Sequence, residues 1–136
     1  MIYLTGVHAL NIEDSLNTCG DWHTSALNWS ALNLRESNGS ILGEWGIETD
    51  KKIPEHSERY NVANTLRAIL DIMQDDNILF LKGFRNDFIC TDEYNNIFFE
   101  KVLLLRKLKN WHGINKLMER EFMFAWLNYK KERGII

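Results

Sequence analysis

Residues 31–47 read ALNLRESNGSILGEWGI, and this stretch does most to indicate the fold class. Apolar and polar residues alternate over 31–36, and apolar residues return over 41–47. Between these runs lies Asn38-Gly39, a dipeptide that type I′ turns favour because both central positions need positive φ. The pattern predicts a β-hairpin in the N-terminal half of the chain.

Outside this stretch, one further strand and several helices are expected. Ile2–Leu4 is short and rich in β-forming residues, so it predicts a strand. A helix is predicted to begin near Ser57 as N-cap and to end at Asp75-Asp76-Asn77. Its apolar residues recur at helical spacing: Val62, Leu66, Ile69, Leu70 and Met73.

The C-terminal half predicts two more helices. Thr91-Asp92-Glu93 supplies an N-cap and early acidic residues for the first, with Gly83–Cys90 before it as a loop. A break near Lys109-Asn110 leads to a last helix that runs to Gly134. The sequence therefore predicts one α+β domain over residues 1–136, in which a small antiparallel sheet or hairpin packs against about three helices.

The composition bounds the class of protein. No apolar run approaches the roughly 18 residues that a membrane helix needs, and the N-terminal residues lack the features of a signal peptide. The two cysteines are too few for a secreted disulfide framework. We expect a cytoplasmic protein with reduced thiols. The high asparagine count and single proline indicate a bacterial or phage source.

Charge is distributed unevenly along the chain. Residues 1–60 hold four Lys/Arg against nine Asp/Glu, whereas residues 101–136 hold nine against three. Such asymmetry can mark a surface for an acidic partner or for phosphates. It can also reflect complementarity between two parts of one fold, or ordinary solvated helix faces.

The densest group of reactive side chains lies early in the chain. His8, Cys19, Asp21 and His23 fall within sixteen positions, beside Gly20. His8, Asp21 and His23 are candidate catalytic residues, because imidazole and carboxylate groups act as general bases. Cys19 and His23 lack the further ligand pair of a zinc site, so no metal and no cofactor are expected. The alternative is a structural turn, with the polar groups bonded to the backbone.

A second candidate is a polar stripe on the helix expected after Ser57. Its members are spaced by three or four residues, as neighbours on one helix face are: His56, Tyr60, Asn64, Arg67 and Asp71. A stripe that mixes these groups could hold a phosphate, a carboxylate or a partner's backbone. The alternative is a solvated helix face.

The third candidate is a basic segment that contains a tryptophan. It consists of Arg106, Lys107, Lys109, Trp111, His112, Lys116 and Arg120. Basic and aromatic side chains together can bind nucleic acid by phosphate contact and stacking. They can equally form a docking surface for a protein, where Trp and Arg are frequent anchors.

The spacing of Arg106 and His112 resembles the motif of HEPN-type ribonucleases. The resemblance implies that the arginine holds the scissile phosphate and that the histidine transfers a proton. It covers seven residues only. Lys107 departs from the family's pattern, and the expected hairpin departs from its all-helical bundle, so no family is assigned.

The familiar phosphate-loop, dinucleotide, metalloprotease and esterase motifs are absent from the sequence. We therefore rank first an interaction or regulatory protein of a bacterial or phage locus, such as a toxin–antitoxin or phage-defence component. It would bind a protein or nucleic-acid partner through the stripe and the basic segment. The alternative is a small hydrolase or ribonuclease that uses His8, Asp21 and His23, with His56 or His112 as a further candidate base, and with cysteine or metal chemistry left open.

Overall fold

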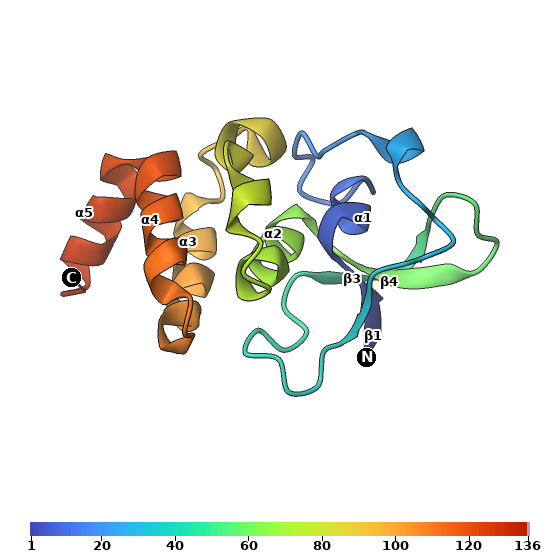
Figure 1. Cartoon of the computed structure of the whole chain (residues 1–136), viewed down its shortest axis with the longest axis horizontal. Coiled ribbons are helices and arrows are strands. Elements are labelled where there is room, and N and C mark those ends of the chain that lie inside the picture. Colours follow the sequence, from blue (N-terminus) through green and yellow to red (C-terminus); the bar gives the residue numbers. More distant parts are fainter. Residues whose placement is uncertain (136) are drawn as a thin grey trace.

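The sheet lies at one end of the molecule beside the short N-terminal helix, and the C-terminal helices lie at the other end (Figure 1). The computed structural model describes residues 1–135. Its four strands belong to one mixed sheet, and the predicted α+β class is confirmed. The strands are β1 (Ile2–Leu4), β2 (Leu34–Glu36), β3 (Ile47–Lys52) and β4 (Arg59–Ala63).

The chain contains both α-helices and shorter helical turns. The α-helices are α1 (Gly6–Leu10), α2 (Thr65–Gln74), α3 (Asn95–Leu103), α4 (Trp111–Phe122) and α5 (Phe124–Glu132). Short 3-10 helices cover Thr24–Ala26, Ile78–Leu81 and Leu104–Lys107, and a π-helix covers Arg85–Ile89. No helix within residues 1–135 is both long enough and apolar enough to cross a bilayer.

The sheet has the order β2-β1-β4-β3, so the expected hairpin over 31–47 is wrong. Ser40 N–H donates to Ser37 O at 3.1 Å and Gly39 has φ 82°, so a turn forms at Asn38-Gly39, but it is not the expected type I′ turn, because Asn38 does not have positive φ. After it, however, the chain passes through further turns, and β2 pairs antiparallel with β1 instead. The hairpin that the structure contains joins β3 and β4, and β1 pairs parallel with β4.

Helix α2 begins at Thr65, eight residues after the expected N-cap at Ser57. Asn64 caps it, because its side-chain oxygen accepts a hydrogen bond from Arg67 N–H at 2.9 Å. The residues before Asn64 belong to β4, whose C-terminal end enters the core with Val62 and Ala63 both buried. The end of the helix at Asp75 agrees with the prediction.

The C-terminal half is more interrupted than expected. The predicted loop over 83–90 contains the π-helix, and α3 begins at Asn95 without a side-chain cap from Thr91. The predicted break at Asn110 is confirmed. The single last helix is wrong, because Met123 has φ 50° and separates α4 from α5.

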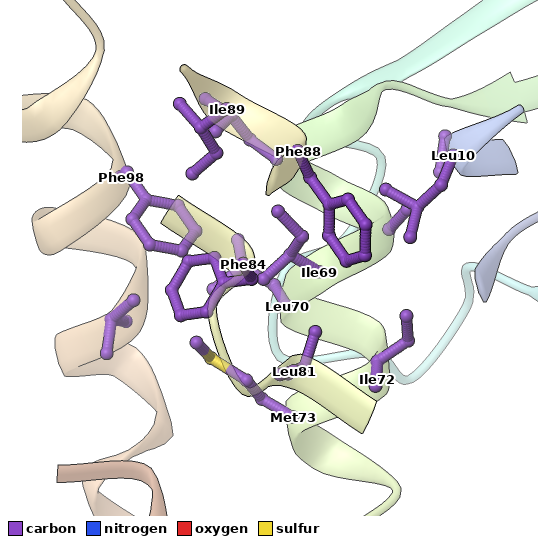
Figure 2. Close-up of a cluster of buried hydrophobic side chains, with 14 of the residues drawn as sticks. Leu10, Ile69, Leu70, Ile72, Met73, Leu81, Phe84, Phe88, Ile89 and Phe98 are labelled. Atoms are coloured by element: carbon purple, nitrogen blue, oxygen red, sulfur yellow. The ribbon is translucent and has the colours of Figure 1, made fainter. Parts of the chain in front are cut away.

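Helix α2 lies at the centre of the core (Figure 2). Its Ile69 and Leu70 are fully buried and face Phe84 and Phe88 of the segment that follows the 3-10 helix Ile78–Leu81, with Phe98 of α3 beyond them. The apolar cluster continues from β1 to α5 through the described residues. Burying side chains of this size provides the main driving force for folding.

Candidate functional site

Asp21 and His23 form a dyad in the loop between α1 and β2. Asp21 Oδ1 lies 2.8 Å from Nδ1 of His23. The His23 side chain is 74% exposed, whereas that of Asp21 is 13% exposed. A carboxylate on Nδ1 orients the ring and leaves Nε2 at the surface, which is the arrangement of an oriented general base.

Asn11, at the end of α1, holds both members of the dyad. Its side-chain amide donates to Asp21 Oδ2 at 3.3 Å, and its Oδ1 accepts from His23 N–H at 2.6 Å. Asp21 N–H donates to Leu10 O at 2.9 Å. Asn11 is 4% exposed, so the dyad is built on a buried support rather than on a free loop.

His8 takes no part in this dyad. Its Nε2 lies 3.0 Å from Asn28 O, and its ring packs edge-on against Trp29, with centroids 4.9 Å apart. Trp29 is buried and donates from Nε1 to Thr24 O. His8 therefore contacts a different part of the loop from the other two catalytic candidates.

Cys19 and Cys90 are joined by a disulfide, and the expectation of reduced thiols is wrong. Their Cα atoms lie 5.9 Å apart, which is typical of disulfides. The bond ties the loop that carries the dyad to the end of the π-helix. Across residues 1–135, no three His, Cys, Asp or Glu side chains gather as metal ligands.

The stripe expected from His56 to Asp71 is divided among three elements. His56 lies in the β3–β4 turn, where Nε2 is 2.6 Å from Trp29 O and Nδ1 is 3.3 Å from Tyr60 OH. Tyr60 belongs to β4, and Asn64 caps α2. Because the helix begins only at Thr65, these residues do not share one helix face.

Arg67 and Asp71 lie inside the molecule instead of on its surface. Their side chains are 0% and 2% exposed and pair at 3.1 Å. The guanidinium also donates to the carbonyl oxygens of Gly43 and Trp45 and to Tyr3 OH. Every contact is internal, so Arg67 offers no free donor to a partner in this structure.

The same network affects Tyr3. Its hydroxyl donates to Asp71 Oδ2 at 2.7 Å, and Thr5 Oγ1 donates to the same oxygen. Burial, together with the hydrogen bond and charge of Asp71, raises the pKa of Tyr3 to about 12, against the opposing charge and hydrogen bond of Arg67. The group therefore stays protonated as a donor within a structural network.

The basic segment lies on the 3-10 helix after α3 and on α4. Its exposed side chains are Arg106, Lys107, Lys109, His112, Lys116 and Arg120. Trp111 is half-buried and packs against Trp126, with ring centroids 6.4 Å apart, so it is not a free stacking surface. Arg106 Nε donates to Leu103 O at 3.0 Å, and Lys116 pairs with Glu119 at 3.8 Å.

Three exposed apolar side chains beside this segment were missed by the sequence reasoning. Met123, Phe124 and Leu127 are 65%, 76% and 42% exposed at the α4–α5 junction. The signal was present in the run Phe122–Leu127, FMFAWL, which has more apolar residues than one helix face can bury. Arg120 precedes them and Lys131 follows them, and both are exposed.

The structure keeps the two predicted binding regions apart. The β3–β4 hairpin and helices α4 and α5 lie at opposite ends of the molecule (Figure 1).

No family model matches the sequence, and comparison with curated proteins and with solved structures found no match. Any function must therefore be argued from the geometry itself.

Proposed function

We propose that this chain is a protein-binding module whose partner docks on the face of α5 and the end of α4. The observation that supports the proposal is the group Met123, Phe124 and Leu127, which we call the apolar stripe. Phe124 is 76% exposed. Large apolar side chains that are exposed singly are ordinary, but a contiguous group at a polar rim is typical of an interaction surface.

The charges around the apolar stripe favour one class of partner. Arg120 lies before the stripe and Lys131 after it, and neither forms an ion pair with any residue in 1–135. The nearby carboxylates are engaged: Glu119 pairs with Lys116 and Lys130, and Glu121 accepts hydrogen bonds from Gly83 and Arg85. A complementary partner presents an amphipathic helix with an apolar face and acidic residues at both ends.

Nucleic acid is a poorer fit to the same surface. Phosphate contacts use cations, and base stacking uses exposed aromatic rings beside them. Here Trp111 is half-buried, and the exposed ring of Phe124 lies between Met123 and Leu127, whose side chains have no π-face on which a base could stack. The chemistry of the stripe is that of a contact between the apolar faces of two amphipathic helices.

Capture of a partner by the tagged protein, with matched surface variants, tests the proposal. Phe124→Glu should reduce capture at least about tenfold, because a charge in the centre of an apolar contact is left unpaired. Leu79→Glu is the control, since Leu79 is 89% exposed on a different surface. Charge reversal of Arg120 and Lys131 should weaken binding more at low salt than at high salt.

Two results would contradict the proposal. One is equal capture by the Phe124→Glu and Leu79→Glu variants. The other is a partner of the wrong class: one that nuclease digestion removes, or a protein that cross-links to Lys131 through a segment that is not acidic and amphipathic. Native mass spectrometry of the complex gives the stoichiometry in each case.

The Asp21–His23 dyad supports a second candidate function, a small hydrolase that uses His23 as general base. The 2.8 Å contact between Asp21 Oδ1 and His23 Nδ1 favours it. In this case His23→Ala should abolish hydrolysis of a generic ester or phosphodiester, and Glu100→Gln, at an exposed residue with no candidate role, should not. Equal rates for the two variants would remove this candidate.

A further inference from the structure

A cavity of about 170 Å³ lies beside the dyad loop, at the N-terminal end of α2. It is separate from the apolar stripe, because α1 and α5 lie at opposite ends of the molecule (Figure 1). Its wall consists of Ile12, Glu13, Asp14, Asn17, Thr18, Trp22 and Thr65. Pockets for drug-sized molecules measure about 300–1,000 Å³, so this cavity suits the end of a side chain or a ligand of similar size.

Trp22 provides an exposed aromatic wall. It is 48% exposed, whereas Trp29 is buried and Trp45 is half-buried. Its backbone has φ 55°, an unusual conformation for a bulky residue, and its indole lies against Gly20. A Cβ atom at position 20 would lie 2.8 Å from Cε2 of the indole, so a glycine there makes room for the ring.

Two of the other four tryptophans already have a cation over the ring. Lys101 Nζ lies 5.2 Å from the centroid of Trp45, and Lys130 Nζ lies 5.4 Å from that of Trp126. No cation of residues 1–135 occupies the corresponding position over Trp22. A tryptophan face attracts ammonium and guanidinium groups within about 6 Å.

One carboxylate in the wall is uncommitted. Asp14 is engaged, because Oδ1 accepts from Leu16 N–H at 3.0 Å and Oδ2 accepts from Thr65 N–H at 2.6 Å. Glu13 is exposed and forms no ion pair within the described part of the chain. No lysine, arginine or histidine lines the cavity.

The electrostatic environment has the sign that a cation requires. Burial raises the pKa of Tyr94, and the charges of Glu93 and Asp14 raise it further. Tyr94 OH donates to Leu16 O at 2.8 Å, which places this hydroxyl next to the same loop. The carboxylates of Glu93 and Asp14 therefore act on this hydroxyl beside the cavity, and the cavity belongs largely to residues 1–60, whose charge balance is acidic.

We propose that this cavity binds the cationic end of an alkylammonium or guanidinium ligand, with the charge between the Trp22 ring and the Glu13 carboxylate. The ligand is a lysine or arginine side chain of a peptide, or a free amine of similar size. Thr18, Asn17 and Thr65 supply the polar part of the wall. This site does not depend on the protein-binding function of the apolar stripe.

NMR titration of the full chain tests the proposal through the indole N–H signals. The probes are Nα-acetyl-lysine methylamide, its arginine and norleucine counterparts, and butylamine, and Trp22→Phe assigns the Trp22 signal. Lysine and arginine probes should shift that signal saturably. The uncharged norleucine probe should bind at least about tenfold more weakly.

Glu13→Gln should lower the affinity for the lysine probe by about threefold to tenfold, because the substitution removes the ion pair with Glu13 and leaves the Trp22 ring in place. Glu100→Gln, at another exposed glutamate, is the control and should leave binding unchanged. Equal binding of butylamine and the lysine probe would identify free amines as ligands, and preference for the lysine probe would identify a peptide. Equal shifts by norleucine and lysine, no saturable shift at millimolar probe, or unchanged binding by Glu13→Gln would each overturn the proposal.

Discussion

The sheet end of the molecule, together with the first turns of α2, buries charged and hydroxyl side chains. The opposite end, formed by helices α3 to α5, buries aromatic rings. At the sheet end, Arg67 and Asp71 pair in the interior and bond the turns of 40–46. At the helical end, the ring centroid of Phe99 lies 4.8–5.3 Å from the ring centroids of Phe122, Trp126 and Tyr129. The two ends use different means of stabilisation.

The difference follows from how each end satisfies its backbone. A helix bonds its own peptide groups, so its side chains need only pack. The turns between β2 and β3 leave carbonyl groups without a ladder partner, and a buried donor must reach them. Arg67 supplies donors to Gly43 and Trp45 from a single side chain.

The largest expected effect comes from removing Arg67. Arg67→Ala leaves Asp71 charged and buried and two carbonyl groups unpaired, so we expect a loss of about 5 kcal/mol in the free energy of unfolding. Arg59→Ala, at an exposed arginine of β4, should cost less than about 0.5 kcal/mol. Urea denaturation measures both. Equal losses would show that the turns of 40–46 do not depend on the network.

Loss of the disulfide should rank second. Cys19 and Cys90 are 71 residues apart, and opening a loop of that size should cost about 4 kcal/mol through the entropy of the unfolded chain. Reductant should therefore lower the denaturation midpoint of the native chain but not that of the Cys19→Ser/Cys90→Ser variant. Two titratable thiols in the unreduced native protein would contradict the pairing.

A pH dependence specific to the sheet end should follow from Tyr3. Its pKa is about 12 in the folded state, against about 10 in the unfolded chain. Between these values the folded state keeps a proton that the unfolded state has lost, so stability falls as pH rises. The contribution, roughly 3 kcal/mol, is complete below pH 10 and lost by about pH 12.

Tyr3→Phe is the control for this dependence. It should lower stability at neutral pH by removing two hydrogen bonds of the network, but it should flatten the fall between about pH 10 and 12. Denaturation midpoints of both proteins across this range measure the difference. Identical slopes would place the titrating group outside the Tyr3–Asp71 contact.

The smallest effect is expected at the helical end. Phe99→Leu keeps an apolar group but loses the edge contacts with three rings, which should cost about 1–2 kcal/mol. Phe124→Leu, at an exposed ring of the apolar stripe, should change stability by less than about 0.5 kcal/mol. If the two changes cost the same, the aromatic packing does not distinguish the buried ring from the exposed one.

Sequence reasoning was most successful where a pattern is local. The apolar spacing of Leu66, Ile69, Leu70 and Met73 predicts core residues of α2, and all four are buried, although the rest of the helix from Thr65 to Met73 is buried as well. The break at Asn110 follows from local composition in the same way. The Asp21–His23 contact joins residues two positions apart, so a turn is sufficient to bring them together.

The predictions that were wrong concern partners distant in the sequence. The stretch 31–47 contains a true turn at Asn38-Gly39, but β2 pairs with β1 at the start of the chain. Arg67 and Asp71 have the spacing of a surface ion pair, and only tertiary contacts show that they are enclosed. The Cys19–Cys90 pairing likewise depends on the loop and the π-helix meeting in space.

The sequence by itself determined the α+β class, the core face of α2 and the acidic and basic ends of the chain, because these depend on composition and on short-range spacing. Tertiary structure alone decided the strand order, the burial of Arg67 and Asp71, the disulfide, and the exposure of Phe124. A side chain's environment depends on which distant elements pack against it, and a local pattern carries no record of that choice.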